Sequence, residues 1–324
     1  MKRILTGIKP TGEIQLGNYL SVIKELVAMQ EKYEVFLMIA DLHAQTVPYS
    51  PKQLRLLTYD LTKSLIALGI NPQKTIIFRQ SDIPAHLYLF WILSTICYLG
   101  ELTRMHEFKE QSERYKKEGV GAGILLYPVL MAADILIYNA DLVPVGEDQR
   151  QHLELARELA RRLNKRFNLK IKIPEIYLHQ ETAKIMSLTD PTKKMSKSLP
   201  KGCLEIFAPA KEIKEKILSA VTDSGKEIIY DPIKKPGISN LMTIYKYLSK
   251  KTYPEIEELF KNKSYYEFKL AIYEEFMNYF QEARKKKNKI TNQQVNKIFQ
   301  QSAVKINRIA NKNLKIILSK VGLR

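Results

Sequence analysis

Two short segments of the sequence gather residue types that suit the binding of phosphate groups. The first, residues 10–18, reads PTGEIQLGN and lies between a predicted strand and a predicted helix. Gly17 at a helix start lets a ligand approach backbone N–H groups, and a helix N-terminus favours phosphate. By itself, such a segment more often forms a tight turn in which a residue such as Asn18 caps the helix.

The second segment, residues 193–198, reads KKMSKS. Lys194 and Lys197 lie three positions apart beside serine hydroxyls, and lysine offers a flexible point charge to a chain of phosphates. A solvated basic loop would have a similar composition. Met195 in its middle and its place at a predicted domain junction favour a site instead.

One acid stands out because its neighbours are apolar. Asp134 lies within residues 131–138, MAADILIY. Taken without further context, Asp134 would more often be an acid on a helix surface, Met131 an ordinary core residue and Tyr127 a half-buried packing residue. The histidines show no metal-site spacing, and the two cysteines, Cys97 and Cys203, cannot form a metal cage by themselves.

The composition is that of a globular protein. The chain has 324 residues, of which 45% are hydrophobic and 27% charged, which excludes a disordered or fibrous protein. No apolar run reaches 18 residues, and we find no apolar core of a secretory signal near the start. Two isolated cysteines suggest a reducing compartment. We therefore expect a cytoplasmic protein without membrane spans.

The net charge of +18 is unevenly distributed. Residues 1–190 hold 24 basic and 21 acidic side chains, whereas residues 191–324 hold 28 and 13. A basic second half indicates a polyanionic partner, either nucleic acid or an anionic membrane. The alternative is a lysine-rich composition imposed by an AT-rich genome.

The elements that must position these residues alternate in the first half. Apolar or β-branched runs predict strands and amphipathic patterns predict helices, with strands at 3–8, 34–40, 75–78 and 142–145 and helices at 51–68 and 148–162. This alternation is typical of an α/β fold with a Rossmann-type doubly wound parallel sheet, which binds ligands at the carboxyl ends of its strands.

The second half has mainly helical periodicity, at 211–221, 241–248, 256–260, 266–287 and 292–318. We therefore expect residues 1–190 to form the α/β domain and residues 191–292 to form a second, all-helical domain. A mobile segment near 190–200 would join them.

Together, the two phosphate-binding segments resemble the paired signatures of class I aminoacyl-tRNA synthetases, called HIGH and KMSKS. The second matches letter for letter, and the first is a divergent form with Gln15 and Asn18 in place of two histidines. Further segments look like tryptophanyl-tRNA synthetases, namely GELTRM at 100–105, MAADIL at 131–136, VPVGEDQ at 143–149, VTDS at 221–224 and PGISN at 236–240. The resemblance covers residues 4 to about 245.

The resemblance implies that tryptophan is activated with MgATP and transferred to tRNA(Trp). It implies catalytic roles for Lys194, Lys197, Gln15 and Asn18. It places ATP on Lys9, Pro10, Thr11, Gln15, Gly17, Asn18, Gly146, Asp148, Ile185, Lys194, Met195, Ser196 and Lys197. The magnesium ion would be carried by ATP, so no protein side chain is expected to be a metal ligand and no other cofactor is expected.

The tryptophan side would be an apolar slot with one acceptor for the indole N–H, which Asp134 would supply. The resemblance implies that tryptophan is bound by Leu5, His43, Tyr127, Met131, Asp134, Val143 and Gln149. It also implies a homodimer, an anticodon-binding role for residues 191–292, and a C-terminal helix at about 293–324 that returns to the catalytic domain.

Three positions depart from the family pattern. Lys9 stands where glutamine is common, Gln111 where a loop lysine is common, and Leu199 where aspartate is common after KMSKS. We expect Lys9 to replace part of the charge missing at Gln111, with Lys109 as a second candidate. Two alternatives remain open, a tyrosyl-tRNA synthetase and a synthetase-like RNA-binding protein without catalysis.

Overall fold

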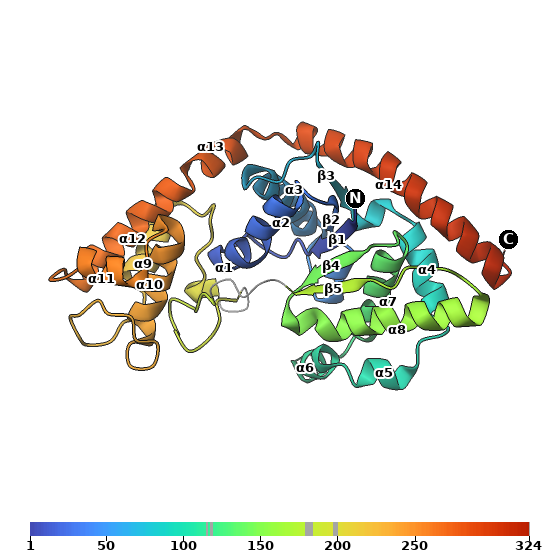
Figure 1. Ribbon diagram of the computed structural model, residues 1–324, viewed down its shortest axis with the longest axis horizontal. Coiled ribbons are helices and arrows are strands. Elements are labelled where there is room, and N and C mark those ends of the chain that lie inside the picture. The colour runs from blue at the N-terminus through green and yellow to red at the C-terminus, as the bar shows by residue number, and fades with distance from the viewer. Residues whose placement is uncertain (115, 117–118, 179–183, 197–199, 324) are drawn as a thin grey trace.

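A five-stranded parallel sheet forms the centre of the molecule in the computed structural model (Figure 1). The structure describes residues 1–114, 116, 119–178, 184–196 and 200–323. The strands are β1 (Arg3–Ile8), β2 (Glu34–Ile39), β3 (Thr75–Arg79), β4 (Leu142–Val145) and β5 (Glu175–Leu178), in the order β3-β2-β1-β4-β5. All four pairings are parallel, which confirms the doubly wound sheet. The short strand β5 was not predicted.

Helices cover both faces of this sheet. On one face Ile4 and Val35 pack against the first helices, and on the other Leu5 and Phe36 pack against the later ones. These helices are α1 (Leu16–Asn18), continued by a π-helical turn (Tyr19–Ile23) and α2 (Lys24–Met29), then α3 (Pro51–Ala67), α4 (Ala85–Ser94), α5 (Leu99–Thr103), α6 (His106–Arg114), α7 (Ala122–Leu136) and α8 (Arg150–Phe167). The strand order reverses between β1 and β4, where such folds bind ligands.

The second part of the chain is helical. Its helices are α9 (Ala210–Leu218), α10 (Pro236–Ser249), α11 (Tyr253–Leu259), α12 (Tyr265–Tyr279), α13 (Gln281–Lys289) and α14 (Asn292–Val321). Phe268, Ile272 and Phe276 of α12 are completely buried and form its core with α9 and α10. The single helix predicted over 266–287 is two helices, because the chain leaves helical geometry at Phe280.

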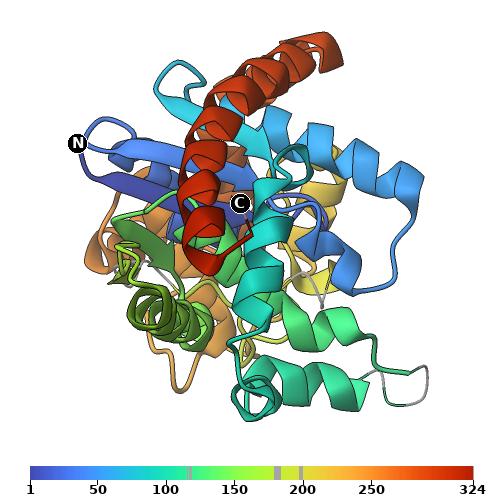
Figure 2. The same ribbon diagram turned by 90° about the vertical axis from the view of Figure 1, so that its right-hand side faces the viewer.

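Helix α14 runs back from the helical part along the edge of the sheet beside β3 and α4 (Figures 1 and 2). It begins at a capping box in which the Thr291 hydroxyl accepts a hydrogen bond from the Gln294 N–H, 3.2 Å away. Asn307 Nδ2 donates to the Asp82 carbonyl at 3.0 Å, and Asn313 Nδ2 donates to the Ile137 carbonyl at 2.7 Å. The C-terminal helix is thus packed on the α/β part of the molecule.

Candidate active site

A cavity of about 800 Å³ opens at the carboxyl ends of β1 and β4. The backbone there is formed by the ends of parallel strands and the turns that follow them, which is where a doubly wound fold places its ligands. Eleven of the predicted site residues line the cavity, namely Leu5, Lys9, Asn18, His43, Tyr127, Met131, Asp134, Val143, Gly146, Gln149 and Lys194. The cavity therefore joins both signatures to the predicted tryptophan slot.

Asp134 lines this cavity together with apolar side chains such as Leu5, Met131 and Val143, and its side chain is 1% exposed. His43 Nε2 lies 2.7 Å from Asp134 Oδ2. The Gln80 amide donates to both carboxylate oxygens, at 3.0 and 2.8 Å. Buried acids require such donors, so Asp134 is held here as a hydrogen-bond acceptor.

Two of the side chains around Asp134 were not predicted. Gln80 directly follows β3, and its Oε1 accepts hydrogen bonds from the N–H groups of Leu42 and His43, at 3.1 and 3.3 Å. His86 is fully buried, with Nδ1 3.2 Å from Asp134 Oδ1 and Nε2 2.6 Å from the Tyr138 hydroxyl. Burial lowers the pKa of His86, and the Asp134 charge opposes this shift. The position of Gln80 at a strand end was the signal available in the sequence.

A second hydrogen-bonded group begins at Tyr127, whose ring centroid lies 6.2 Å from that of His43. The Tyr127 hydroxyl is 2.8 Å from His152 Nε2, and His152 Nδ1 is 3.1 Å from Gln149 Oε1. Burial raises the pKa of Tyr127 well above its ordinary value. His152, which was also not predicted, thus connects the two residues expected to hold the substrate ammonium group.

Lys9 lies on the cavity wall near the ring of Tyr127, with Nζ 5.3 Å from the ring centroid. Although much of the residue is exposed, protein atoms around the ammonium group lower the pKa of Lys9 by desolvation, and the Glu107 charge partly opposes this shift. Gln111 Nε2 donates to Glu107 Oε1 at 3.0 Å. Glu107 therefore interacts with two of the three positions at which the sequence departs from the family pattern, Lys9 and Gln111.

The two signatures contact each other directly. The buried Gln15 amide donates to the Met195 carbonyl at 3.3 Å. Cys203 Sγ lies 2.8 Å from Gln15 Oε1 and 2.9 Å from the Ser196 carbonyl oxygen, either of which can accept its single S–H. A Cβ on Gly17 would lie 3.9 Å from Ile185 and 4.0 Å from Met195. These residues hold the signatures together.

Several predicted ATP ligands do not line the cavity in the described part of the chain: Pro10, Thr11, Gln15, Gly17, Ile185, Met195 and Ser196. Asn18 does line it, and its Oδ1 is buried with no hydrogen-bond partner among the described residues. Lys197 and Leu199 lie outside the described residues, as does the side chain of Asp148.

The cavity lining combines apolar side chains and a buried acid with the polar side chains of Asn18, Lys9 and Lys194. Such a site suits a ligand that has an apolar ring with one N–H group and also binds beside an anionic phosphate chain. Within the described residues, no group of three or more His, Cys, Asp or Glu side chains is arranged to hold a metal ion. No described helix is long and apolar enough to cross a membrane.

Comparisons with known proteins agree with this geometry. The family model described as "tRNA synthetases class I (W and Y)" matches residues 1–281. A tryptophan–tRNA ligase of Bacillus anthracis is 44% identical over 326 residues, covering 100% of this chain and 98% of that protein. The tryptophanyl-tRNA synthetase structure from Mycoplasma pneumoniae has a TM-score of 0.88 at 37% identity, covering 100% of this chain and 98% of that one. The Campylobacter jejuni enzyme, complexed with ADP and tryptophan, has a TM-score of 0.89 at 34% identity, covering 99% and 100%.

Proposed function

This chain belongs to the class I tRNA synthetases for tryptophan and tyrosine, and we propose that it is an ATP-dependent tryptophan–tRNA ligase with the roles for its residues that follow. It activates L-tryptophan to tryptophanyl-adenylate and transfers it to tRNA(Trp). We choose tryptophan because the buried Asp134 carboxylate lines the cavity beside apolar side chains.

Asp134 accepts the indole N–H in this proposal. Indole is a donor only, so its partner must be an acceptor. Leu5, Met131 and Val143 line the same cavity and surround the ring, with His43 beside the acid. At the other end of the amino acid, Tyr127 and Gln149 hold the ammonium group.

Activation needs no general base, because the tryptophan carboxylate is already a nucleophile. A carboxylate oxygen attacks the α-phosphorus of ATP in line, and pyrophosphate leaves. Catalysis then rests on positioning and on neutralising the charge of the leaving group. Lys194, Lys197 and Lys9 supply positive charge, Asn18 and Gln15 belong to the first signature, and Mg²⁺ enters with ATP.

The second step transfers the tryptophanyl group to the 3′-terminal ribose of tRNA(Trp). A ribose hydroxyl attacks the carbonyl carbon of the adenylate, and AMP leaves. We assign residues 1–190 with the returning C-terminal helix to the catalytic domain, and residues 191–292 to the domain that binds the anticodon.

The chain also forms a homodimer in this proposal. Large apolar side chains are exposed together on α4 and α5: Leu87 (51%), Tyr88 (52%), Trp91 (68%), Tyr98 (65%) and Leu99 (66%). A monomer rarely exposes such a group, and an isologous contact between two copies would bury it. Because Cys97 and Cys203 are not joined by a disulfide, a reducing compartment fits, and we place the enzyme in the cytoplasm.

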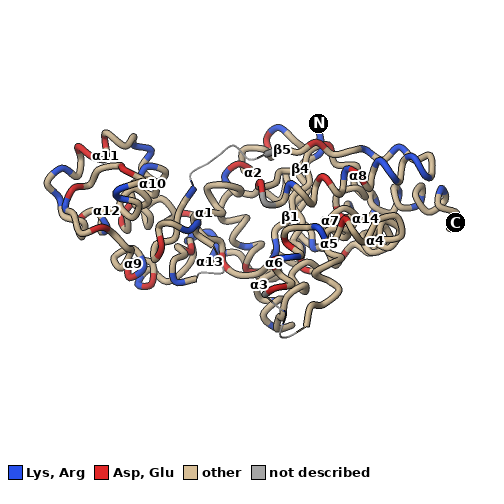
Figure 3. Tube along the Cα trace, turned by 90° about the horizontal axis from the view of Figure 1, so that it is seen from below, with Lys and Arg blue, Asp and Glu red and all other residues tan. Residues whose placement is uncertain are grey.

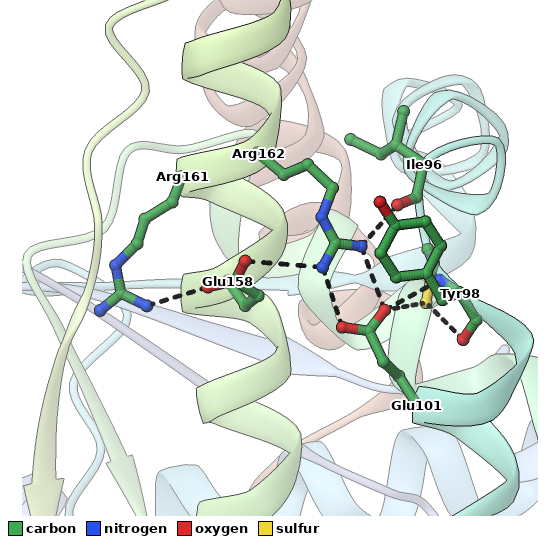
Figure 4. Close-up of polar contacts among 7 residues, drawn as sticks. Ile96, Tyr98, Glu101, Glu158, Arg161 and Arg162 are labelled. Atoms are coloured by element: carbon green, nitrogen blue, oxygen red, sulfur yellow. Dashed lines mark hydrogen bonds and ion pairs between the residues drawn. The ribbon is translucent and has the colours of Figure 1, made fainter.

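The exposed face of α5 is held rigidly by α8 (Figure 4). Arg162 Nη2 lies 2.9 Å from Glu101 Oε1, and Arg162 Nη1 donates to the Ile96 carbonyl at 2.6 Å. The guanidinium carbon also lies 4.2 Å from the centroid of the Tyr98 ring. These contacts orient Tyr98 before any partner binds, which lowers the entropy cost of association.

Tryptophan-dependent ATP–pyrophosphate exchange tests the proposed function. We expect exchange with tryptophan, little with tyrosine, and charging of tRNA(Trp) in a second assay. Exchange with tyrosine in preference to tryptophan would identify a tyrosyl-tRNA synthetase. Absence of exchange together with retained tRNA binding would identify an RNA-binding protein without catalysis.

A further inference from the structure

Most of the net charge of the chain is concentrated in its last 42 residues. Residues 283–324 contain twelve Lys and Arg and no Asp or Glu, whereas residues 191–282 contain 16 basic and 13 acidic side chains. Figure 3 shows basic and acidic positions interspersed over α9 to α12. The basic character that the sequence indicated for the whole second half therefore belongs to α13 and α14.

Helix α14 presents this charge on one side. Its apolar side, with Phe299, Ile306, Ala310 and Ile317, is buried against the sheet and its helices. The opposite side exposes five basic residues that we call the α14 stripe: Lys297, Lys305, Arg308, Lys312 and Lys315. At 1.5 Å per residue, the α14 stripe is about 27 Å long.

The α14 stripe carries uncompensated charge. Within the described part of the chain, none of its five residues forms an ion pair, whereas Lys287 of α13 pairs with Asp60 at 2.8 Å. The helix dipole would favour cations only in the last turn. A lysine-rich composition would add lysine but would not remove every acidic residue from 42 consecutive positions. A surface evolved only for solubility normally mixes both signs.

We propose that the α14 stripe binds the sugar–phosphate backbone of the tRNA substrate, so that the catalytic part of the molecule carries a tRNA contact of its own. This inference rests on the proposed function, because it takes tRNA as the substrate. Lysines contact phosphates as point charges, which positions a nucleic acid without reading its sequence. Phosphates held on the stripe fix the tRNA body relative to the active-site cavity, while recognition of its bases occurs elsewhere.

The test compares two quadruple variants with equal loss of charge. The stripe variant is Lys297→Gln, Lys305→Gln, Lys312→Gln and Lys315→Gln. The control variant changes four other exposed lysines, none in an ion pair within the described residues: Lys32→Gln, Lys52→Gln, Lys165→Gln and Lys170→Gln. The Kd for tRNA(Trp) transcript is measured between about 50 and 200 mM salt, the range over which counterion release is apparent.

The stripe variant should bind tRNA at least tenfold more weakly at low salt. Its slope of log Kd against log salt should fall by about 3, since each phosphate contact contributes about 0.7 to 0.9. The control variant should match the wild type. Equal effects of both variants, or no effect of the stripe variant, would overturn the inference. So would loss of binding to phosphatidylserine vesicles with unchanged tRNA binding, which would assign the stripe to a membrane.

Pyrophosphate exchange separates this inference from the proposed function. Both variants should retain wild-type exchange with tryptophan, because the α14 stripe is no part of the cavity lining. A wild-type protein that binds tRNA through the stripe but shows no exchange would refute the proposed function alone. A wild-type protein that exchanges normally, with a stripe variant that binds tRNA normally, would refute the inference alone.

Discussion

At the scale of single residues, we expect the hydrogen-bonded Asp134 carboxylate to set the selectivity of the cavity for its amino acid. The Gln80 amide donates to both oxygens of this carboxylate, and His43 Nε2 lies 2.7 Å from one of them. In the proposed complex, the indole N–H is a further donor to the same carboxylate. A substrate without that donor leaves one position on the acid unpaired in a buried site. Sites built to bond a polar group reject analogues lacking it by about 10⁴ or more.

Asp134→Ala should therefore lower kcat/KM for tryptophan far more than it changes the KM for ATP. Because the acceptor is lost, the preference for tryptophan over phenylalanine in pyrophosphate exchange should fall by about 100-fold or more. A variant that keeps the wild-type preference would show that Asp134 does not bind the indole. Asp134→Asn, which retains an acceptor oxygen, should keep more of the preference than Asp134→Ala.

Lys9→Gln should raise the KM for ATP about tenfold, the effect of one weakened charged contact. Desolvation lowers the pKa of Lys9, so its charge is complete below that lowered pKa and is lost as pH rises through it. The kcat/KM of the wild type for ATP should therefore decline with rising pH, and this decline should begin at a lower pH than a lysine with an ordinary pKa would produce. The Lys9→Gln variant should lack this decline in a pH profile of kcat/KM for ATP.

The double variant Lys9→Gln with Gln111→Lys tests the replacement of one lysine by the other. Both positions interact with Glu107, so their effects should not be independent. We expect the second change to recover most of the loss, with a coupling of about 1 kcal/mol or more in a double-mutant cycle. Simple additivity would make Lys109 the better candidate for the missing charge.

At the scale of elements, the start of α10 is held by close backbone contact with the loop after α9. A Cβ on Gly237 would lie 2.2 Å from the Val221 carbonyl oxygen, and backbone at that distance must move. Gly237→Ala should destabilise the protein by about 1 to 3 kcal/mol, the usual cost of overpacking. The midpoint of urea unfolding would show this.

Gly100→Ala provides the matched control. A Cβ at Gly100 in α5 would meet nothing within 4 Å. Alanine has the higher helix propensity, so this variant should be neutral or slightly more stable. If both variants unfold at the same urea concentration, the contact at Gly237 has no energetic weight.

Local sequence patterns predicted where the strands lie, but they did not predict which elements contact one another. The runs at β1 and β4 were located to the residue, because buried parallel strands are continuous apolar runs between turns. Strand β5, four residues long, has no such run. Pro128 interrupts an apolar run in the sequence, yet α7 continues through it, because tertiary packing overrides local preference.

In the candidate site, too, contacts between distant parts of the chain were not predicted. The signatures and the resemblance named eleven of the residues that line the cavity. They could not name His86 or His152, because the partners Tyr138 and Tyr127 of these side chains come from other elements and are fixed only by the topology. The contact of Gln15 with the second signature likewise spans 180 positions.

At the scale of the whole molecule, we expect the exposed apolar face of α4 and α5 to form the contact between two copies of the chain. Trp91→Glu places a charge in the centre of this face, where an isologous contact would bring two copies of it together. We expect the wild type to sediment as a dimer and the variant as a monomer in analytical ultracentrifugation. Leu56→Glu, at a residue 59% exposed on α3, should leave the dimer intact. A wild-type monomer at micromolar concentration would contradict the proposed assembly.

The return of α14 to the sheet also has a consequence for how the protein is made. Ile306, Ala310 and Leu314 complete a hydrophobic cluster whose other members include Leu5, Phe36 and residues of α4 and α7. During synthesis the ribosome delivers the first residues of this cluster long before the last ones. The nascent chain must therefore expose that apolar surface until nearly all of α14 has emerged. Chains terminated early should be substrates for chaperones and proteases rather than small folded domains.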